Sequence, residues 1–173
     1  LGELIGAVMA AQAVDSPVYT FLPKLLSPRM SDEEYEELLE EAEEAQQRFS
    51  RHMREGEKFM RQSRHDLASR EFAAARDMKP GEPDILQKLA LTTYKAKLPD
   101  EISALRAGLE IIRTLDPEAS NDPETVGVAG AITKRLWLRE GDRESLDAAI
   151  QFYRRGFEVK RDYYNGENLA LCF

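Results

Sequence analysis

The chain has 173 residues and a formal net charge of -8, because 32 acidic side chains outweigh 24 basic ones. This balance argues against general nucleic-acid binding, since proteins that bind nucleic acids broadly present clustered basic surface to the phosphates. The composition is rich in alanine, leucine, glutamate and arginine, which favour helices, so we expect an all-α protein with one core.

Cysteine content and hydropathy bear on location. Cys172 is the single cysteine, which excludes an internal disulfide and favours a reducing, cytoplasmic setting. No apolar run approaches the roughly 20 residues that a membrane-spanning helix needs, and residues 1–14 lack the basic leader of a signal peptide. The chain starts without Met and stops within an apolar run, so we expect a segment cut from a larger protein.

Residues 1–30 are expected to form an apolar helix followed by a connector. Apolar residues recur at helical spacing over residues 1–14, and prolines bound the connector at Pro17, Pro23 and Pro28. We expect this segment to pack on the first helices of the domain that follows. The alternative is a former junction with an upstream domain.

A capping box marks the next helix. Ser31 precedes Glu34 by three residues, so the two side chains can satisfy free amides at a helix start, and we expect the helix to begin at Asp32. No breaker occurs before Gly56, which predicts an amphipathic helix of roughly 30 residues with a solvated acidic face.

Small and aromatic residues then alternate as in a helix-turn-helix repeat of about 34 residues. The positions in register are Gly56, Phe59, Ala68, Phe72, Ala75 and Pro80. The small residues let antiparallel helices approach closely, and the aromatic ones fill the gap to the next pair. The pattern resembles the tetratricopeptide repeat and predicts a tetratricopeptide-like α-solenoid behind the N-terminal helical extension. Its repeats would span about 49–82, 83–119 and 123–162, with a partial repeat at 163–173.

Caps and prolines delimit the later repeats. Pro83 suits the first turn of a helix, Asp100 follows a proline as a cap, and Asp122 opens the third repeat. Asn165-Gly166 is either a turn or a tolerated break at the start of a helix over 167–173. The partial repeat leaves an apolar face uncovered, so a homodimer through it is a further expectation.

The C-terminal third resembles a known family more specifically. The residues that carry the resemblance are Trp137-Leu138, Gly141-Asp142, Leu146 to Ile150, Tyr153 to Glu158 and Tyr163 to Leu169. They are similar to the TRAF-binding domain in the central regulatory part of apoptosis-signal-regulating kinases, and to bacterial sensor modules related to it. The resemblance implies a scaffold and regulator without catalytic residues of its own.

Residue types that support catalysis or metal binding are few. His52 and His65 lie on different predicted helices with no cysteine near, so they form no metal set, and we expect both on exposed basic surface. Residues 127–130 contain two glycines within a predicted helix, which is not a phosphate loop. We expect Cys172 in the core and not as a nucleophile. The sequence therefore predicts no enzyme, metal or cofactor.

Solenoids bind partners with first-helix side chains on their concave face. Extrapolation of the repeat places there Met53, Glu57, Met60, Arg61, Gln87, Leu91, Tyr94, Lys95, Gly127, Ala131, Lys134, Arg135 and Tyr164. Among them, the basic row of Arg61, Lys95, Lys134 and Arg135 can accept carboxylates or phosphates of an extended ligand. The alternative interpretation is that these are solvated surface charges.

These features predict a non-enzymatic module that docks a protein or peptide within a larger signalling protein. The alternative is a sensor of an anionic small molecule or nucleotide signal. An open channel favours a peptide, whereas a closed pocket with convergent Arg and Lys favours the small molecule.

Overall fold

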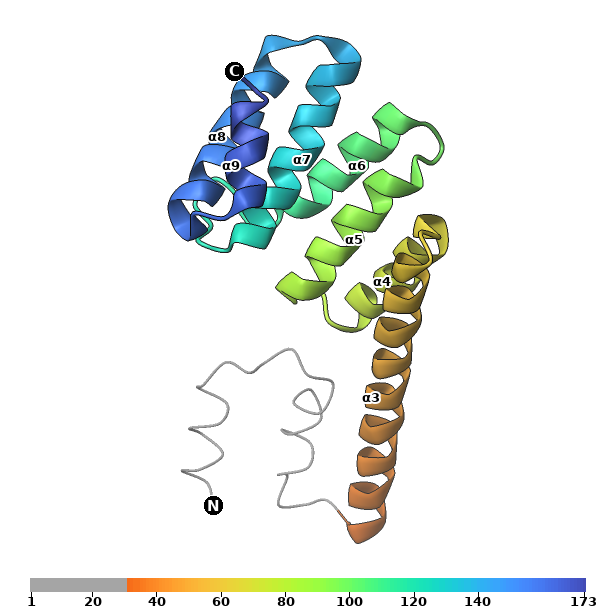
Figure 1. Ribbon diagram of the computed structural model, residues 1–173. Helices are drawn as coiled ribbons and strands as arrows, with labels where there is room; N and C mark the ends of the chain where they lie inside the picture. Colours follow the sequence, from red (N-terminus) through yellow and green to blue (C-terminus); the bar gives the residue numbers. More distant parts are fainter. Residues whose placement is uncertain (1–30) are drawn as a thin grey trace.

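The computed structural model describes residues 31–173, so the expected helix and connector over 1–30 lie outside the described residues. The described part contains seven helices and no strand, which confirms an all-α fold of the tetratricopeptide type (Figure 1). The helices are α3 (Asp32–Arg61), α4 (His65–Met78), α5 (Pro83–Ala96), α6 (Glu101–Arg113), α7 (Pro123–Glu140), α8 (Arg143–Lys160) and α9 (Tyr163–Ala170).

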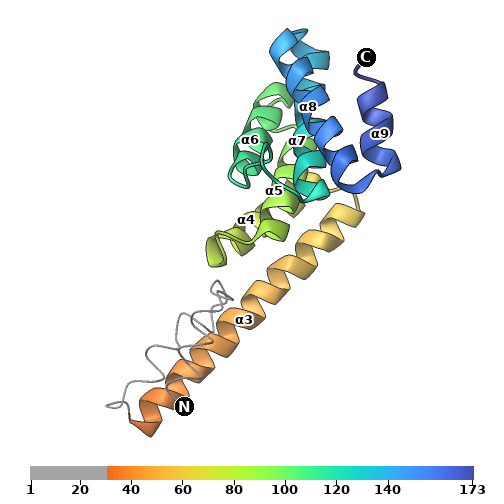
Figure 2. The same cartoon turned by 90° about the vertical axis from the view of Figure 1, so that its left-hand side faces the viewer.

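The first helix, α3, begins at Asp32 and is 30 residues long, as expected. Ser31 Oγ accepts a hydrogen bond of 3.2 Å from the Glu34 amide, and the Ser31 amide donates one of 2.8 Å to Glu34 Oε2. Three acidic residues in its first turn also suit the positive end of the helix dipole. Figure 2 shows α3 extending past the other described helices.

Small residues set the approach of paired helices, as the repeat pattern requires. A Cβ added to Gly56 of α3 would lie 2.7 Å from the Phe72 ring of α4. In the third pair, a Cβ on Gly130 of α7 would lie 3.0 Å from the Tyr153 ring of α8. Phe72 and Tyr153 are fully buried, so each ring occupies space that its glycine leaves open.

Three clusters form the core along the described part of the solenoid, and one of them joins α8 to the C-terminal segment around Tyr153 and Cys172. Of the other two clusters, the smaller joins α3, α4 and α5 around Phe72 and Leu89. The larger joins α5, α6, α7 and α8, and among its members Leu105, Ile112 and Ile132 are fully buried. Burial of such side chains, at about 1.5–3 kcal/mol each, is the main force that holds successive pairs together.

Aspartate caps start four of the helices. The expected caps Asp100 and Asp122 are confirmed, because each side chain accepts hydrogen bonds from backbone amides of the next turn. Asp142 and Asp162 do the same for α8 and α9. The expectation of a turn or break at Asn165-Gly166 is wrong, since the Asp162 cap starts α9 at Tyr163.

The two histidines are a further correction, because neither lies on fully exposed surface. His52 is half-buried, with Nδ1 2.7 Å from Glu71 Oε2. His65 is also half-buried, and its Nδ1 has no hydrogen-bond partner among the described residues. Cys172 is buried as expected, and burial raises the pKa of its thiol.

The described residues contain neither a candidate metal site nor a membrane-spanning helix. Within residues 31–173, no three His, Cys, Asp or Glu side chains are placed to hold a metal ion together. None of the described helices is long and apolar enough to span a bilayer.

Candidate functional site

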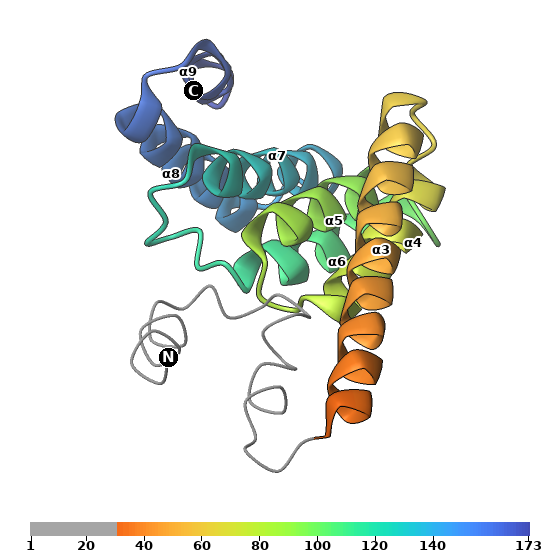
Figure 3. The same ribbon diagram turned by 90° about the horizontal axis from the view of Figure 1, so that it is seen from below.

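Residues of α5, α7 and α9 line a groove of about 920 Å³, which we call the inner groove. Figures 1 and 3 show where these three helices lie in the fold. The first helices of successive pairs line it, because the pairs stack with these helices on the same side. Side chains expected on the concave face and found in its lining are Leu91, Tyr94, Lys95, Gly127, Ala131, Arg135 and Tyr164.

Arg135 lies at the centre of the contact between α5 and α7. Its guanidinium carbon lies 5.1 Å from the centroid of the Tyr94 ring, a cation–π distance. Its Nη1 donates a hydrogen bond of 3.1 Å to the Ala131 carbonyl. The remaining guanidinium N–H groups have no protein partner in the described part of the chain, so they are free to bind a ligand.

Three cations on the inner groove have no ion-pair partner among residues 31–173: Lys95, Arg135 and Lys160. Two carboxylates of the groove have other partners, since Asp122 accepts from Gln87 and from Thr125 Oγ1 at 2.8 Å, and Asp162 accepts from Asn165. Gln87 Nε2 also donates to Thr125 Oγ1 at 2.8 Å. Gln87 thus ties α5 to the start of α7 beside the groove.

A smaller hollow of about 220 Å³ adjoins the inner groove and shares Tyr94, Lys95 and Arg135 with it. His65 and Glu101 lie on its far side. Burial, and then the nearby Lys95 ammonium, lower the pKa of His65, so His65 is neutral near pH 7. Positive charge at this end of the groove therefore comes from Lys95 and Arg135.

The wall formed by α9 depends on a buried asparagine. Asn165 is 1% exposed, and its Nδ2 donates to Asp162 Oδ1 at 3.1 Å. A Cβ added to Gly156 would lie 2.5 Å from Asn165 Oδ1, whereas one added to Gly127 would meet nothing nearer than 3.5 Å. The missing side chain of Gly156 therefore makes the space in which α9 docks.

One family matches most of this chain. The family described as Tetratricopeptide Repeats-Sensor matches residues 64–173. The chain belongs to this family. All of the helices that line the inner groove lie inside the matched range, so the groove is part of a tetratricopeptide sensor domain.

Two kinases contain a segment similar to this sensor domain. Mitogen-activated protein kinase kinase kinase 15 of Mus musculus is 36% identical over 74 residues, which are 42% of this chain and 5% of the kinase. The kinase nsy-1 of Caenorhabditis elegans is 38% identical over 77 residues, 41% of this chain and 5% of that protein. This chain thus spans only a small part of these relatives. The matches confirm the resemblance to the regulatory region of apoptosis-signal-regulating kinases.

Four of the residues expected to bind a partner do not line the inner groove. Gln87 lies beside it, where it donates to Thr125 Oγ1. Met60 packs on the core between α3 and α4, and Arg61 is exposed at the end of α3. Lys134 donates to Asn168 of α9, with its ammonium 5.7 Å from the Tyr153 ring centroid. The repeat register placed these residues on the concave side, but tertiary contacts of α3, α7 and α9 decide what they touch.

Eight further residues line the groove and were not predicted from the sequence: Asp122, Pro123, Glu124, Val128, Lys160, Asp162, Tyr163 and Asn165. Lys160 ends a second helix, and only first-helix positions had been extrapolated. Tyr163 was missed because α9 was expected to begin later. Asp162, two residues after the end of α8, would have been the signal for Tyr163, because an Asp at this position caps the first turn of a helix.

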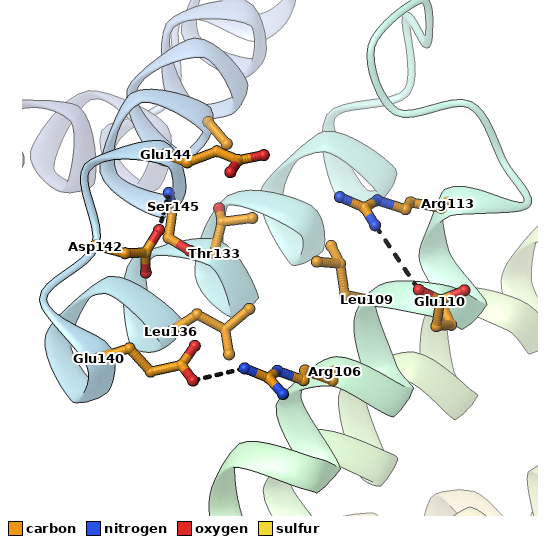
Figure 4. Close-up of a pocket in the computed structure, with 11 residues that line it drawn as sticks. Arg106, Leu109, Glu110, Arg113, Thr133, Leu136, Glu140, Asp142, Glu144 and Ser145 are labelled. Carbon is orange, nitrogen blue, oxygen red and sulfur yellow. Dashed lines mark hydrogen bonds and ion pairs between the residues drawn. The ribbon is translucent and has the colours of Figure 1, made fainter.

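A second hollow, the outer cleft, lies on the side of the second helices and has a volume of about 530 Å³. Figure 4 shows its arginines paired with carboxylates. Arg106 lies 2.7 Å from Glu140, and Arg113 lies 3.7 Å from Glu110. Because its arginines are already neutralised, the outer cleft is the weaker candidate for binding a charged partner.

Proposed function

We propose that this sensor domain is a non-catalytic regulatory module that binds a protein or peptide partner in the inner groove. The observation that carries the proposal is a set of three cations that have no ion-pair partner within residues 31–173, Lys95, Arg135 and Lys160, beside Tyr94 and Tyr164. Tyr164 is 51% exposed, and tyrosine and arginine are enriched among the side chains that contribute most to protein recognition sites. Of the other cations in residues 31–173, Lys88, Arg106 and Arg139 have carboxylate partners. Arg61 and Arg154 have none within this range, so the gathering of three such cations in one groove is what supports the proposal.

The setting of the groove supports a protein partner. It follows three first helices of a solenoid, the surface on which such folds bind extended ligands. The kinase relatives suggest that the domain serves as a scaffold within a larger signalling protein in the cytoplasm. The likeness to a TRAF-binding region suggests that its partner is a protein of the TRAF type. Binding there would regulate an attached or associated effector.

An anionic small molecule or nucleotide signal is the second candidate. The observation that favours it is the convergence of Lys95 and Arg135 where the inner groove meets the smaller hollow. A third proposal concerns self-association, because Leu171 and Phe173 are 65% and 83% exposed beside α9. A second copy would cover them, and sedimentation of the chain over a range of concentrations tests this.

Thermal unfolding of the chain, alone and with added ligands, tests the proposal. Pooled acidic peptides should raise the unfolding temperature, because a ligand that binds only the folded state stabilises it. Lys95→Ala and Arg135→Ala should abolish the increase. The matched control, Arg106→Ala in the outer cleft, should keep it. An increase that survives in both groove variants would show that the inner groove is not the binding site, and an increase with nucleotides alone would favour the small molecule.

A further inference from the structure

The inner groove is electrically polar along its length. Lys95 and Arg135 lie at one end of the groove. Lys95 is near the C-terminus of α5, and Arg135 is past the middle of α7. Asp122 and Glu124 lie at its other end, where α7 starts, and Asp162 lies there too, where α9 starts. Because the first helices run in the same direction, their capping aspartates gather at one end of the groove.

The acidic end is the weaker of the two. Asp122 and Asp162 each cap a helix, so the partial positive charge of a helix start offsets part of each carboxylate. Lys160 lies at the same end and offsets more. Glu124 is exposed and has no side-chain partner among the described residues, so it supplies the carboxylate most able to bind a cation.

The stretch of the inner groove between its two ends is lined by apolar and small side chains. Gly127 and Ala131 keep the surface of α7 low there, since neither has a side chain beyond Cβ. Leu91 lies on the α5 side and Tyr164, 51% exposed, on the α9 side. An apolar or aromatic side chain of a ligand would bury its surface against these residues.

We propose that the inner groove binds an extended peptide segment of a partner whose charge pattern complements this polarity. The inference rests on the proposed function and specifies the partner. A basic side chain lies beside Glu124, an apolar or aromatic one contacts Leu91 and Tyr164, and an acidic one pairs with Lys95 and Arg135. A phosphate or nucleotide would satisfy only the basic end and would be repelled by the carboxylates at the other.

The helix geometry sets the spacing of the two charges. Glu124 and Arg135 are about 16 Å apart along α7, at about 1.5 Å per residue. An extended chain covers that distance in about five residues, at about 3.3 Å each. The partner segment therefore carries its basic and acidic residues about five positions apart, with the apolar residue between them.

A random-sequence peptide library displayed on phage, selected on the full chain, tests this pattern. The expected enriched peptides combine a Lys or Arg with an Asp or Glu about five positions apart and an aromatic or aliphatic residue between. A synthetic copy of the most enriched peptide should bind at least about tenfold more weakly to the Lys95→Glu, Arg135→Glu variant. Changing its acidic residue to Lys should restore binding to that variant. Glu124→Lys should weaken binding about threefold, since that end is partly compensated.

The matched control is the Arg106→Glu, Arg113→Glu variant of the outer cleft, which should bind the peptide like the wild type. Circular dichroism establishes that each variant is folded. Enrichment of uniformly acidic peptides, or equal affinity after the charge spacing is shortened, would overturn the pattern and leave the groove as a binding site. If the library yields no peptide whose binding depends on the groove, both the charge pattern and the proposed binding of a peptide in the groove are overturned. Binding of inorganic phosphate or ATP that depends on Arg135 would then support the small-molecule candidate.

Discussion

The inner groove and the outer cleft both contain arginine and carboxylate side chains, yet they differ in how their charges are arranged. In the outer cleft, Arg106 pairs with Glu140 and Arg113 with Glu110. In the inner groove, Lys95, Arg135 and Lys160 have no such partner in the described part of the chain. Pairing, and not the number of arginines, therefore distinguishes a candidate binding surface from a structural one.

The two hollows also differ in their third wall. The outer cleft lies between α6, α7 and α8, which are long helices of the repeats. The inner groove is closed by α9, a helix of eight residues held by Asn165 and by the contact of Lys134 with Asn168. Its shape thus depends on one short element, so changes that release α9 should alter the groove and spare the cleft.

The largest effect is expected from Gly156→Ala. The added Cβ would lie 2.5 Å from Asn165 Oδ1, so Asn165 and α9 must move, at a cost of about 2 kcal/mol in the free energy of unfolding. The matched control is Gly127→Ala, whose Cβ would make only ordinary contacts, the nearest at 3.5 Å. It should be neutral or slightly stabilising, because alanine favours helices more than glycine. Urea unfolding of both variants measures the difference, and equal destabilisation would contradict this account of α9.

A smaller effect is expected from removing one arginine on each side. Arg135→Ala loses the contact with Tyr94 and should lower the free energy of unfolding by about 1 kcal/mol. Arg106→Ala breaks an ion pair in which its own side chain is mostly exposed, and should cost less than about 0.5 kcal/mol. Urea unfolding at low and at high salt separates them, since only the Arg106 contribution should fall with salt. A larger loss of stability in Arg106→Ala than in Arg135→Ala would show that the outer cleft is the more tightly packed side.

The smallest effect concerns pH and the hollow beside the inner groove. Burial and Lys95 lower the pKa of His65 in the folded state, so the unfolded chain binds a proton there more readily, near pH 6.5. Stability should therefore fall as the pH drops through that value toward the lower pKa of the folded state. His65→Gln should make the fall between about pH 7.5 and 5.5 shallower.

The control for the pH prediction is His52→Gln. His52 contacts Glu71 away from this hollow, so the substitution leaves the contribution of His65 unchanged. Chemical unfolding at the two pH values measures the slope in each variant. An unchanged slope in His65→Gln would mean that His65 is as accessible to protons in the folded protein as in the unfolded chain.

Much of the fold follows from local patterns that tertiary structure reinforces. The small and aromatic positions identified the helix pairs because Gly56 and Phe72 are in contact across one of them. Asp100 and Asp122 identified helix starts because a cap acts within a single turn. The start of α9 was missed because Asn-Gly usually indicates a turn, and only the space beside Gly156 keeps Asn165 helical and buried.

The sequence predicted those residues of the candidate site that recur at the repeat spacing. Lys95 and Arg135 occupy equivalent places in successive first helices, so the repeat register predicts both on the groove. Lys134 is the neighbour of Arg135 in sequence and points toward a different element, α9, where Asn168 binds it. Lys160 belongs to the end of a second helix, and its place at the groove depends on how α8 turns into α9. Such contacts are set by the packing of whole helices.

The burial of Asn165 bears on how the protein ages. In an open turn, an Asn-Gly pair deamidates readily, because the amide nitrogen of the glycine attacks the side-chain carbonyl and no Cβ hinders it. In α9 the Gly166 amide donates to the Asp162 carbonyl at 3.2 Å, and Asn165 is packed between α7 and α8. The pair is thereby protected for as long as α9 is docked. The rate at which Asn165 converts to aspartate in stored protein, measured by mass spectrometry, would therefore report the fraction of time that α9 spends undocked.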